Sequence, residues 1–313
     1  MIKAPSPVMI GDANTAKKNL IIGVIKGYEY GALNKFVNSI KNTKFTGDVV
    51  LLTSSVSDET ISELERRGIK TCAFQYRVNS GSMNSWSRFW PKIRPLKSMI
   101  PFKIMRFIMM RIFHLMDVRH FHMRDFLERN KDKYGLVLMT DVRDVVFQTD
   151  PFEIPLGGDV EFFEESSIVK IKDCSFNSGA IRERFGSEIL QECQDQPIHC
   201  FGTVRGSIGG ILSFLKMYEV YCMEAIQYAT GTADQGILNV MINKFSSSFD
   251  FVTVPNLTGA VATLGWMKYK DIPINAVGGI INPINGKSIP IIHQYDRFPQ
   301  LEDLVERQTS NKY

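Results

Sequence analysis

The chain has 313 residues, 44% of them hydrophobic, and its 37 basic and 33 acidic residues give a formal net charge of +4. This composition is typical of a globular protein, and it excludes collagen-like and low-complexity chains. Five cysteines without a Cys-x-x-Cys pair favour reduced thiols over disulfides or a zinc site. A weak net charge without a binding motif disfavours nucleic acid as a partner.

The N-terminal residues carry no secretory signal, because Lys3, Asp12, Lys17 and Lys18 interrupt any apolar stretch there. No run in the sequence approaches the roughly 20 apolar residues of a membrane span. We therefore expect a cytoplasmic protein.

Apolar runs and helix-like patterns alternate along the N-terminal part of the chain. We expect strands at 19–25, 48–53 and 69–74, and helices at 32–42 and 58–68. This alternation predicts an α/β fold with a doubly wound, mostly parallel sheet flanked by helices, which binds ligands at the carboxyl ends of its strands. The sequence lacks G-x-G-x-x-G and phosphate-loop patterns, which disfavours dinucleotide oxidoreductases and P-loop NTPases.

A basic and apolar insertion occupies residues 84–116. From Arg66 to Met116 the chain has no acidic residue and eleven lysines and arginines, interleaved with aromatic residues and methionines. This pattern suits a helix in the headgroup layer of an anionic membrane, which would place the protein peripherally on the cytosolic face. It equally suits an insertion that packs its apolar face on the core. Three prolines break the segment before a long helix forms: Pro91, Pro95 and Pro101.

The most informative segment is the apolar run from Leu136 to Thr140, which leads into Asp141-Val-Arg143-Asp144. A buried strand that delivers two carboxylates at its C-terminal end is a common way for open α/β sheets to hold a metal-bound phosphate. The alternative for this segment alone is a strand followed by a solvated turn.

Four motifs together resemble GT-A glycosyltransferases, in particular the glycogenin-like and lipopolysaccharide-galactosyltransferase-like group. They are the aspartate segment with its Asp150-Pro151 tail, Asn177-Ser178-Gly179, Asp234-Gln235 with a following Leu-Asn, and the late strand that ends in His293. Two features depart from the family pattern. The acids of the first motif are three residues apart instead of two, and Gln-Tyr-Asp replaces the Lys-Pro-Trp that often follows the late histidine.

The resemblance implies one GT-A-like domain over residues 1–313 that works as a hexosyl- or pentosyltransferase. The enzyme would move a sugar from a nucleotide-diphosphate sugar to a glycan or other hydroxyl acceptor. The resemblance favours retention of anomeric configuration. The implied cofactor is Mn²⁺ or Mg²⁺, which stabilises the charge of the pyrophosphate leaving group. Carboxylates suit either ion, and one imidazole shifts the preference towards Mn²⁺.

The implied metal ligands are Asp144 and His293, with Asp141 a third ligand or a partner of the donor ribose. Arg119 fits the arginine that reaches the donor from the preceding helix, and its alternative is a surface ion pair with Asp125 or Glu128. Arg143 either neutralises phosphate charge or forms an ion pair at the strand edge.

The remaining donor-binding positions are Tyr28, after the first strand, and Asn177, Ser178 and Gly179, which we expect to form a tight turn. Asp234 and Gln235 are the expected catalytic pair: the aspartate would hold sugar hydroxyls and the glutamine would lie near the reacting carbon. Helix capping alone would also explain this aspartate. An inverting mechanism would need a base, for which Asp173 and Asp234 are the candidates.

Two other functions remain open. A sugar nucleotidyltransferase shares the sheet and a metal–aspartate site, but it normally has a glycine-rich basic loop after the first strand, which Val24-Ile-Lys-Gly-Tyr matches poorly. A non-catalytic module for membrane docking or carbohydrate binding could also use this fold.

Overall fold

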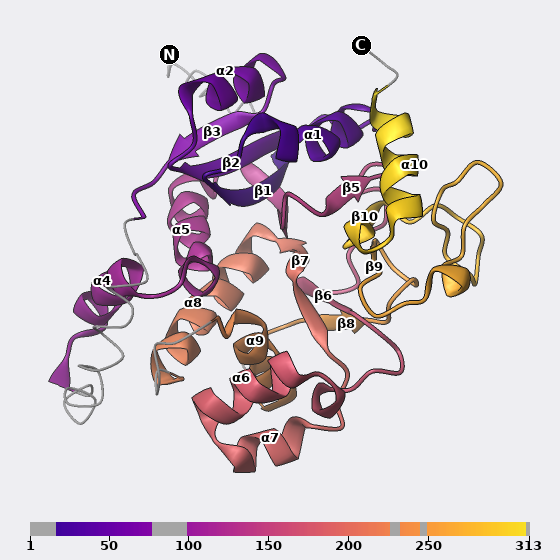
Figure 1. Ribbon diagram of the computed structural model, residues 1–313. Helices are drawn as coiled ribbons and strands as arrows, with labels where there is room; N and C mark the ends of the chain where they lie inside the picture. The colour runs from indigo at the N-terminus through magenta and orange to yellow at the C-terminus, as the bar shows by residue number, and fades with distance from the viewer. Residues whose placement is uncertain (1–16, 77–98, 226–231, 245–248, 311–313) are drawn as a thin grey trace, which may run out of the picture.

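The computed structural model describes residues 17–76, 99–225, 232–244 and 249–310 (Figure 1). Its strands are β1 Lys18–Lys26, β2 Asp48–Ser54, β3 Lys70–Ala73, β4 Tyr134–Thr140, β5 Val145–Phe147, β6 Val160–Glu164, β7 His199–Ser207, β8 Val252–Val254, β9 Val261–Thr263 and β10 Ile291–His293. Its α-helices are α1 Asn34–Lys41, α2 Asp58–Arg66, α4 Phe102–Ile112, α5 Leu115–Asn130, α6 Ser175–Phe185, α7 Ser187–Cys193, α8 Ile208–Glu224, α9 Asp234–Lys244 and α10 Pro299–Ser310.

A seven-stranded sheet in the order β3-β2-β1-β4-β7-β6-β8 forms the centre of the fold. Strands β3, β2, β1 and β4 are parallel to one another, and β6 is parallel to β8. This confirms the expected α/β class with a mostly parallel sheet. Strand β7 is antiparallel to both β4 and β6. It therefore begins at the edge where those two strands end, a reversal that the sequence pattern did not predict.

Alternate residues of the central strands face two separate cores, as the two-residue period of a strand requires. In β1, Leu20 and Ile22 pack in the core that is shared with α4, α5, α8 and α9. Ile21 and Ile25 face the opposite core, which is shared with α1 and α2. Helices cover both faces of the sheet, so its polar ligand-binding positions are confined to the strand ends.

A second sheet, with the order β5-β10-β9, lies beside the first and places β10 in its centre. Helix α10 covers this sheet and packs next to α1 (Figure 1). Strand β10 pairs antiparallel with β5, which directly follows the aspartate segment. This pairing brings the C-terminal part of the chain to the end of β4.

Several local predictions need correction. Asn177, Ser178 and Gly179 lie in the first turns of α6 and do not form a tight turn. The helix expected at 58–68 is α2, which ends at Arg66, and the side chain of Ser57 caps its start by accepting the backbone N–H of Thr60.

Of the expected insertion at 84–116, residues 84–98 lie outside the described part of the chain. The remainder includes α4, an 11-residue helix that begins directly after Pro101. Among the helices that the structure describes, none combines the length and apolar character needed to cross a membrane.

Candidate active site

A cavity of about 490 Å³ opens where β4, β6 and β10 end and β7 begins. The first turns of α6 and α9 and one turn of α5 complete its wall. The sequence-predicted residues that line it are Arg119, Asp141, Asp144, Asn177, Asp234, Gln235 and His293. Segments that are far apart in the sequence thus meet in one pocket, as expected at the carboxyl edge of an α/β sheet.

Asp141, Asp144 and His293 could together hold a metal ion. One ligand atom from each lies within 4.8 Å of the other two. The Nε2 atom of His293 is 3.8 Å from Oδ2 of Asp141 and 3.8 Å from Oδ2 of Asp144. This nitrogen is buried and has no hydrogen-bond partner. A buried, unpaired nitrogen that faces two carboxylates fits the donor set of a divalent cation.

The backbone leaves space for such an ion at Gly202. A Cβ atom at this position would lie 2.6 Å from Oδ2 of Asp141 and 2.9 Å from Nε2 of His293. The other ring nitrogen of His293, Nδ1, lies 3.4 Å from Sγ of Cys200 and is directed away from the carboxylates. Glycine is therefore required here to keep the group of three open.

Arg119 joins two of the predicted acids. Its Nη1 donates to Oδ1 of Asp141 and its Nη2 to Oδ2 of Asp234, at 3.2 Å for the latter. It does not form the alternative surface pair with Asp125, which binds Arg106. Because Arg119 uses only one oxygen of Asp141, the other oxygen stays directed at His293.

The charges of the site shift several pKa values. Burial lowers the pKa of Arg119, but the carboxylates of Asp141 and Asp234 outweigh this and raise it. For Asp234, burial raises the pKa, while the neighbouring His120 imidazole, 3.8 Å away, and the charge of Arg119 bring it below the usual value. Asp234 is therefore an ionised acceptor for polar hydrogens.

Burial is also the largest influence on Asp144, and it raises the pKa of this carboxyl. The His293 imidazole opposes the rise, and the neighbouring carboxylates of Asp141 and Asp296 add to it. A cation bound between Asp141 and Asp144 would favour the ionised forms of both carboxyl groups.

Gln235 belongs to a second group of contacts in the cavity wall. Its Nε2 donates to Oε1 of Glu165 at 3.2 Å, and the indole Nε1 of Trp266 donates to Oε2 at 3.0 Å. Glu165 is buried, and Trp266 is 41% exposed. One carboxylate thus fixes both the glutamine and a partly exposed aromatic ring at the cavity mouth.

The remaining predicted positions fall at different distances from the cavity. Asn177 is buried in its wall with an unpaired Oδ1, but Ser178 and Gly179 do not line it. Tyr28 packs beside the core of α1 and α2. Arg143 points away and pairs with Asp296 at 3.4 Å, which is the strand-edge alternative. Asp173 is exposed and also lies outside the wall.

Sequence reasoning missed Glu165, Cys200 and Gly202. Glu165 follows the apolar strand β6, so the argument that identified Asp141 would have found it too. Cys200 and Gly202 depend on the antiparallel direction of β7, for which the sequence offered no signal.

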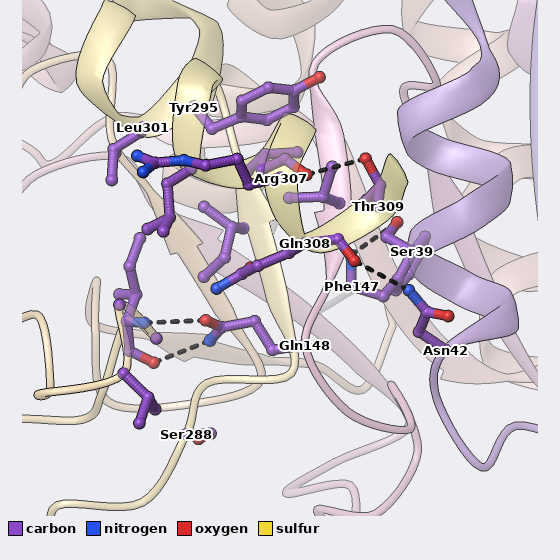
Figure 2. A pocket seen from close by; sticks show the side chains of 18 of the residues that line it. Ser39, Asn42, Phe147, Gln148, Ser288, Tyr295, Leu301, Arg307, Gln308 and Thr309 are labelled. Carbon is purple, nitrogen blue, oxygen red and sulfur yellow. Dashed lines mark hydrogen bonds between the residues drawn. The ribbon is translucent and has the colours of Figure 1, made fainter. Parts of the chain in front are cut away.

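A second cavity, of about 470 Å³, lies between α10, α1 and β5 (Figure 2). None of the buried polar side-chain atoms of its described lining lacks a hydrogen-bond partner. The side chain of Gln148 donates to the backbone oxygens of Ile280 and Ile289 and accepts the backbone N–H of Ile280. Among the described residues that line it there is no acidic, histidine or cysteine side chain.

No protein-family model and no curated protein matches the chain. Among solved structures, it is similar to the apo form of the bifunctional glycosyltransferase WbbM, with a TM-score of 0.51 and 12% identity. The similarity covers 96% of this chain and 51% of that one, so the chain spans about half the length of its structural relative. The likeness shows a fold consistent with the GT-A type.

Proposed function

We propose that the chain is a metal-dependent glycosyltransferase, in which residues 1–313 form one GT-A-like domain. It would transfer a sugar from a nucleotide-diphosphate sugar to a glycan or another hydroxyl acceptor. The observation that carries the proposal is the unpaired Nε2 of His293, which faces Asp141 and Asp144 at the end of the central strand. The likeness to a glycosyltransferase fold adds independent support.

Asp141, Asp144 and His293 would hold Mn²⁺ or Mg²⁺. Such an ion, when bound, stabilises the negative charge of a pyrophosphate leaving group. Arg119 would set the position of Asp141 and add a buried positive charge next to the donor. Asp234, ionised and held by Arg119, would accept hydrogen bonds from sugar hydroxyls. The side-chain Oδ1 of Asn177 is unpaired and would accept a hydrogen bond from the nucleotide-sugar donor.

Glu165 would act as a positioning residue on the acceptor side. It holds Gln235, which would lie near the reacting carbon, and it holds the indole N–H of Trp266, whose partly exposed ring would suit the apolar face of a sugar. Both carboxylate oxygens of Glu165 already accept N–H groups.

The first test is thermal unfolding with nucleotide diphosphates and nucleotide sugars, with and without Mn²⁺, for the wild type and Asp144→Asn. A ligand at about a hundred times Kd stabilises by about 2.7 kcal/mol, which is roughly 4 °C for a chain of this size. We expect a metal-dependent shift with one nucleotide that is absent in the variant. Absence of any shift would favour a non-catalytic binding module.

The acceptor side is tested with Glu165→Gln, assayed for transfer with the donor that the unfolding screen identifies. An amide offers a donor where the carboxylate offers an acceptor, so either Gln235 or Trp266 loses its partner. Loss of a hydrogen bond to a charged group corresponds to a decrease in transfer rate of roughly tenfold or more. Donor-dependent stabilisation should stay at the wild-type value. Trp266→Phe is the matched variant, because it keeps an aromatic ring at this position but removes the indole N–H that Glu165 accepts. A loss of donor binding in Glu165→Gln would contradict an acceptor-side role.

A further inference from the structure

Helix α4 is fixed to the protein along one face. Met105 and Met109 are buried in the core that α4 shares with α5, α8 and α9. Between them, Arg106 donates to Glu219 of α8 at 2.9 Å and to Asp125 of α5 at 2.8 Å. Because apolar packing and a buried ion pair hold the same face, the orientation of α4 about its axis is set. Its opposite face is presented outward.

The outward face of α4 consists of Lys103, Ile104, Phe107 and Arg111, all of them exposed. Lys103, Phe107 and Arg111 follow one another at intervals of four residues, and Ile104 lies three residues before Phe107, so they share one side of the helix. Ile104 is 52% and Phe107 57% exposed, and the guanidinium of Arg111 lies 4.2 Å from the centre of the Phe107 ring.

The apolar surface continues beyond the N-terminal end of the helix. Phe102 is 44% exposed and Met99 is 76% exposed. Four of the large apolar residues that the structure exposes therefore lie within nine positions of the chain. A concentration of this kind on the surface marks a contact region, whereas single exposed apolar residues do not.

The charge of α4 selects the kind of partner. Its ionisable residues are Lys103, Arg106 and Arg111, and the sequence contains no acid between Arg66 and Met116. Arg106 is engaged with the core, so the charges directed outward are positive. They lie between bulky apolar side chains on one surface, and lipid is the partner that satisfies both: acyl chains accept the apolar groups and headgroup phosphates accept the basic ones.

We propose that the outward face of α4, together with Met99 and Phe102, docks the protein on an anionic lipid membrane. In Figure 1, α4 lies at the margin of the molecule, on the other side of α5 and α8 from α10. Docking through this face is independent of the chemistry of the candidate active site, so the two proposals can fail separately.

The experiment measures co-sedimentation of the full chain with vesicles of phosphatidylcholine, alone or mixed equally with phosphatidylglycerol. We expect binding to the mixed vesicles only, and weaker binding as salt rises. Lys103→Glu with Arg111→Glu should lower the partition constant by at least about 30-fold, since each basic residue near the surface contributes about 1 kcal/mol and the new carboxylates add repulsion. Ile104→Ser with Phe107→Ser should lower it by at least about tenfold through lost apolar insertion.

Two double variants on other surfaces serve as matched controls. Lys268→Glu with Lys287→Glu makes the same change in net charge at exposed positions, and Val277→Ser with Ile284→Ser removes two apolar side chains that are each 80% exposed. Both should bind as the wild type does. Wild-type protein that does not bind the mixed vesicles would overturn the proposal, as would equal losses in the controls. A wild-type dimer that Ile104→Ser with Phe107→Ser dissociates, without vesicle binding, would assign the face to a second copy of the chain.

Discussion

The cavity at the end of β4 and the cavity beneath α10 have similar volumes, about 490 and 470 Å³, but differ in how their polar atoms are satisfied. Beneath α10, Gln148 forms three hydrogen bonds with the backbone. At the end of β4, His293 Nε2 and Asn177 Oδ1 are buried without partners. Because leaving a buried polar atom unpaired costs free energy, such atoms identify a ligand site better than cavity size does.

The largest difference between the two cavities should appear on removal of an arginine. Arg119→Met leaves the carboxylates of Asp141 and Asp234 without their shared cation, and breaking a buried pair in this way costs about 3–5 kcal/mol. Arg307 lines the cavity beneath α10 and is exposed. Arg307→Met should change the free energy of unfolding by less than about 0.5 kcal/mol. Urea unfolding measures both values, and equal effects would remove the distinction.

Gly202→Ala tests whether the space between Asp141 and His293 is needed. The added methyl group would occupy the position of the ion, so we expect a loss of metal-dependent stabilisation and a decrease in transfer rate of about 10²- to 10³-fold. Gly209→Ala is the control, since a Cβ atom there meets nothing within 4 Å. Retention of Mn²⁺-dependent activity in Gly202→Ala would contradict the proposed metal position.

Gln148→Leu, in contrast, should lower the stability of the protein without lowering its activity. It leaves two backbone oxygens and one backbone N–H without their partner, which costs about 1–3 kcal/mol of stability. Transfer activity and nucleotide binding should stay unchanged below the unfolding temperature. A specific loss of activity in this folded variant would give the cavity beneath α10 a functional role.

Part of the acid sensitivity of the protein should come from His199, the first residue of β7. Burial lowers the pKa of His199 to about 4, from an ordinary value of 6.5. Between these values the unfolded chain binds a proton that the folded chain excludes. The contribution of His199 to stability is therefore complete above pH 6.5 and decreases as the pH falls, by about 1.4 kcal/mol per pH unit.

His199→Gln should remove this part of the slope in denaturant titrations between pH 6.5 and 4. Gln148→Leu should keep the wild-type slope, because the cavity beneath α10 has no histidine or acid in its described lining. An unchanged slope in His199→Gln would show that this histidine is protonated in the folded state.

Some residues of the site could be predicted from local sequence patterns, and others, such as Arg119 and Asp234, only from the resemblance. An apolar strand followed by polar residues marked Asp141, Asp144 and His293. The structure places Asp141 directly after β4, Asp144 directly before β5 and His293 at the end of β10. Arg143 could not be oriented in this way, because its direction depends on Asp296, which is distant in sequence. The turn expected at Asn177 is a helix, and the roles of Cys200 and Gly202 follow from the direction of β7, a tertiary feature without a local pattern.

The central place of β10 in the small sheet also affects the order in which the protein can assemble. During synthesis, the strands of the large sheet emerge from the ribosome before β10 does, and N-terminal parts of a chain generally begin to fold first. Strands β5 and β9 both pair with β10, so their sheet cannot form before β10 has been synthesised. Until then, Asp141 and Asp144 also lack the imidazole of His293. A nascent chain can therefore build most of its framework before its candidate metal site exists.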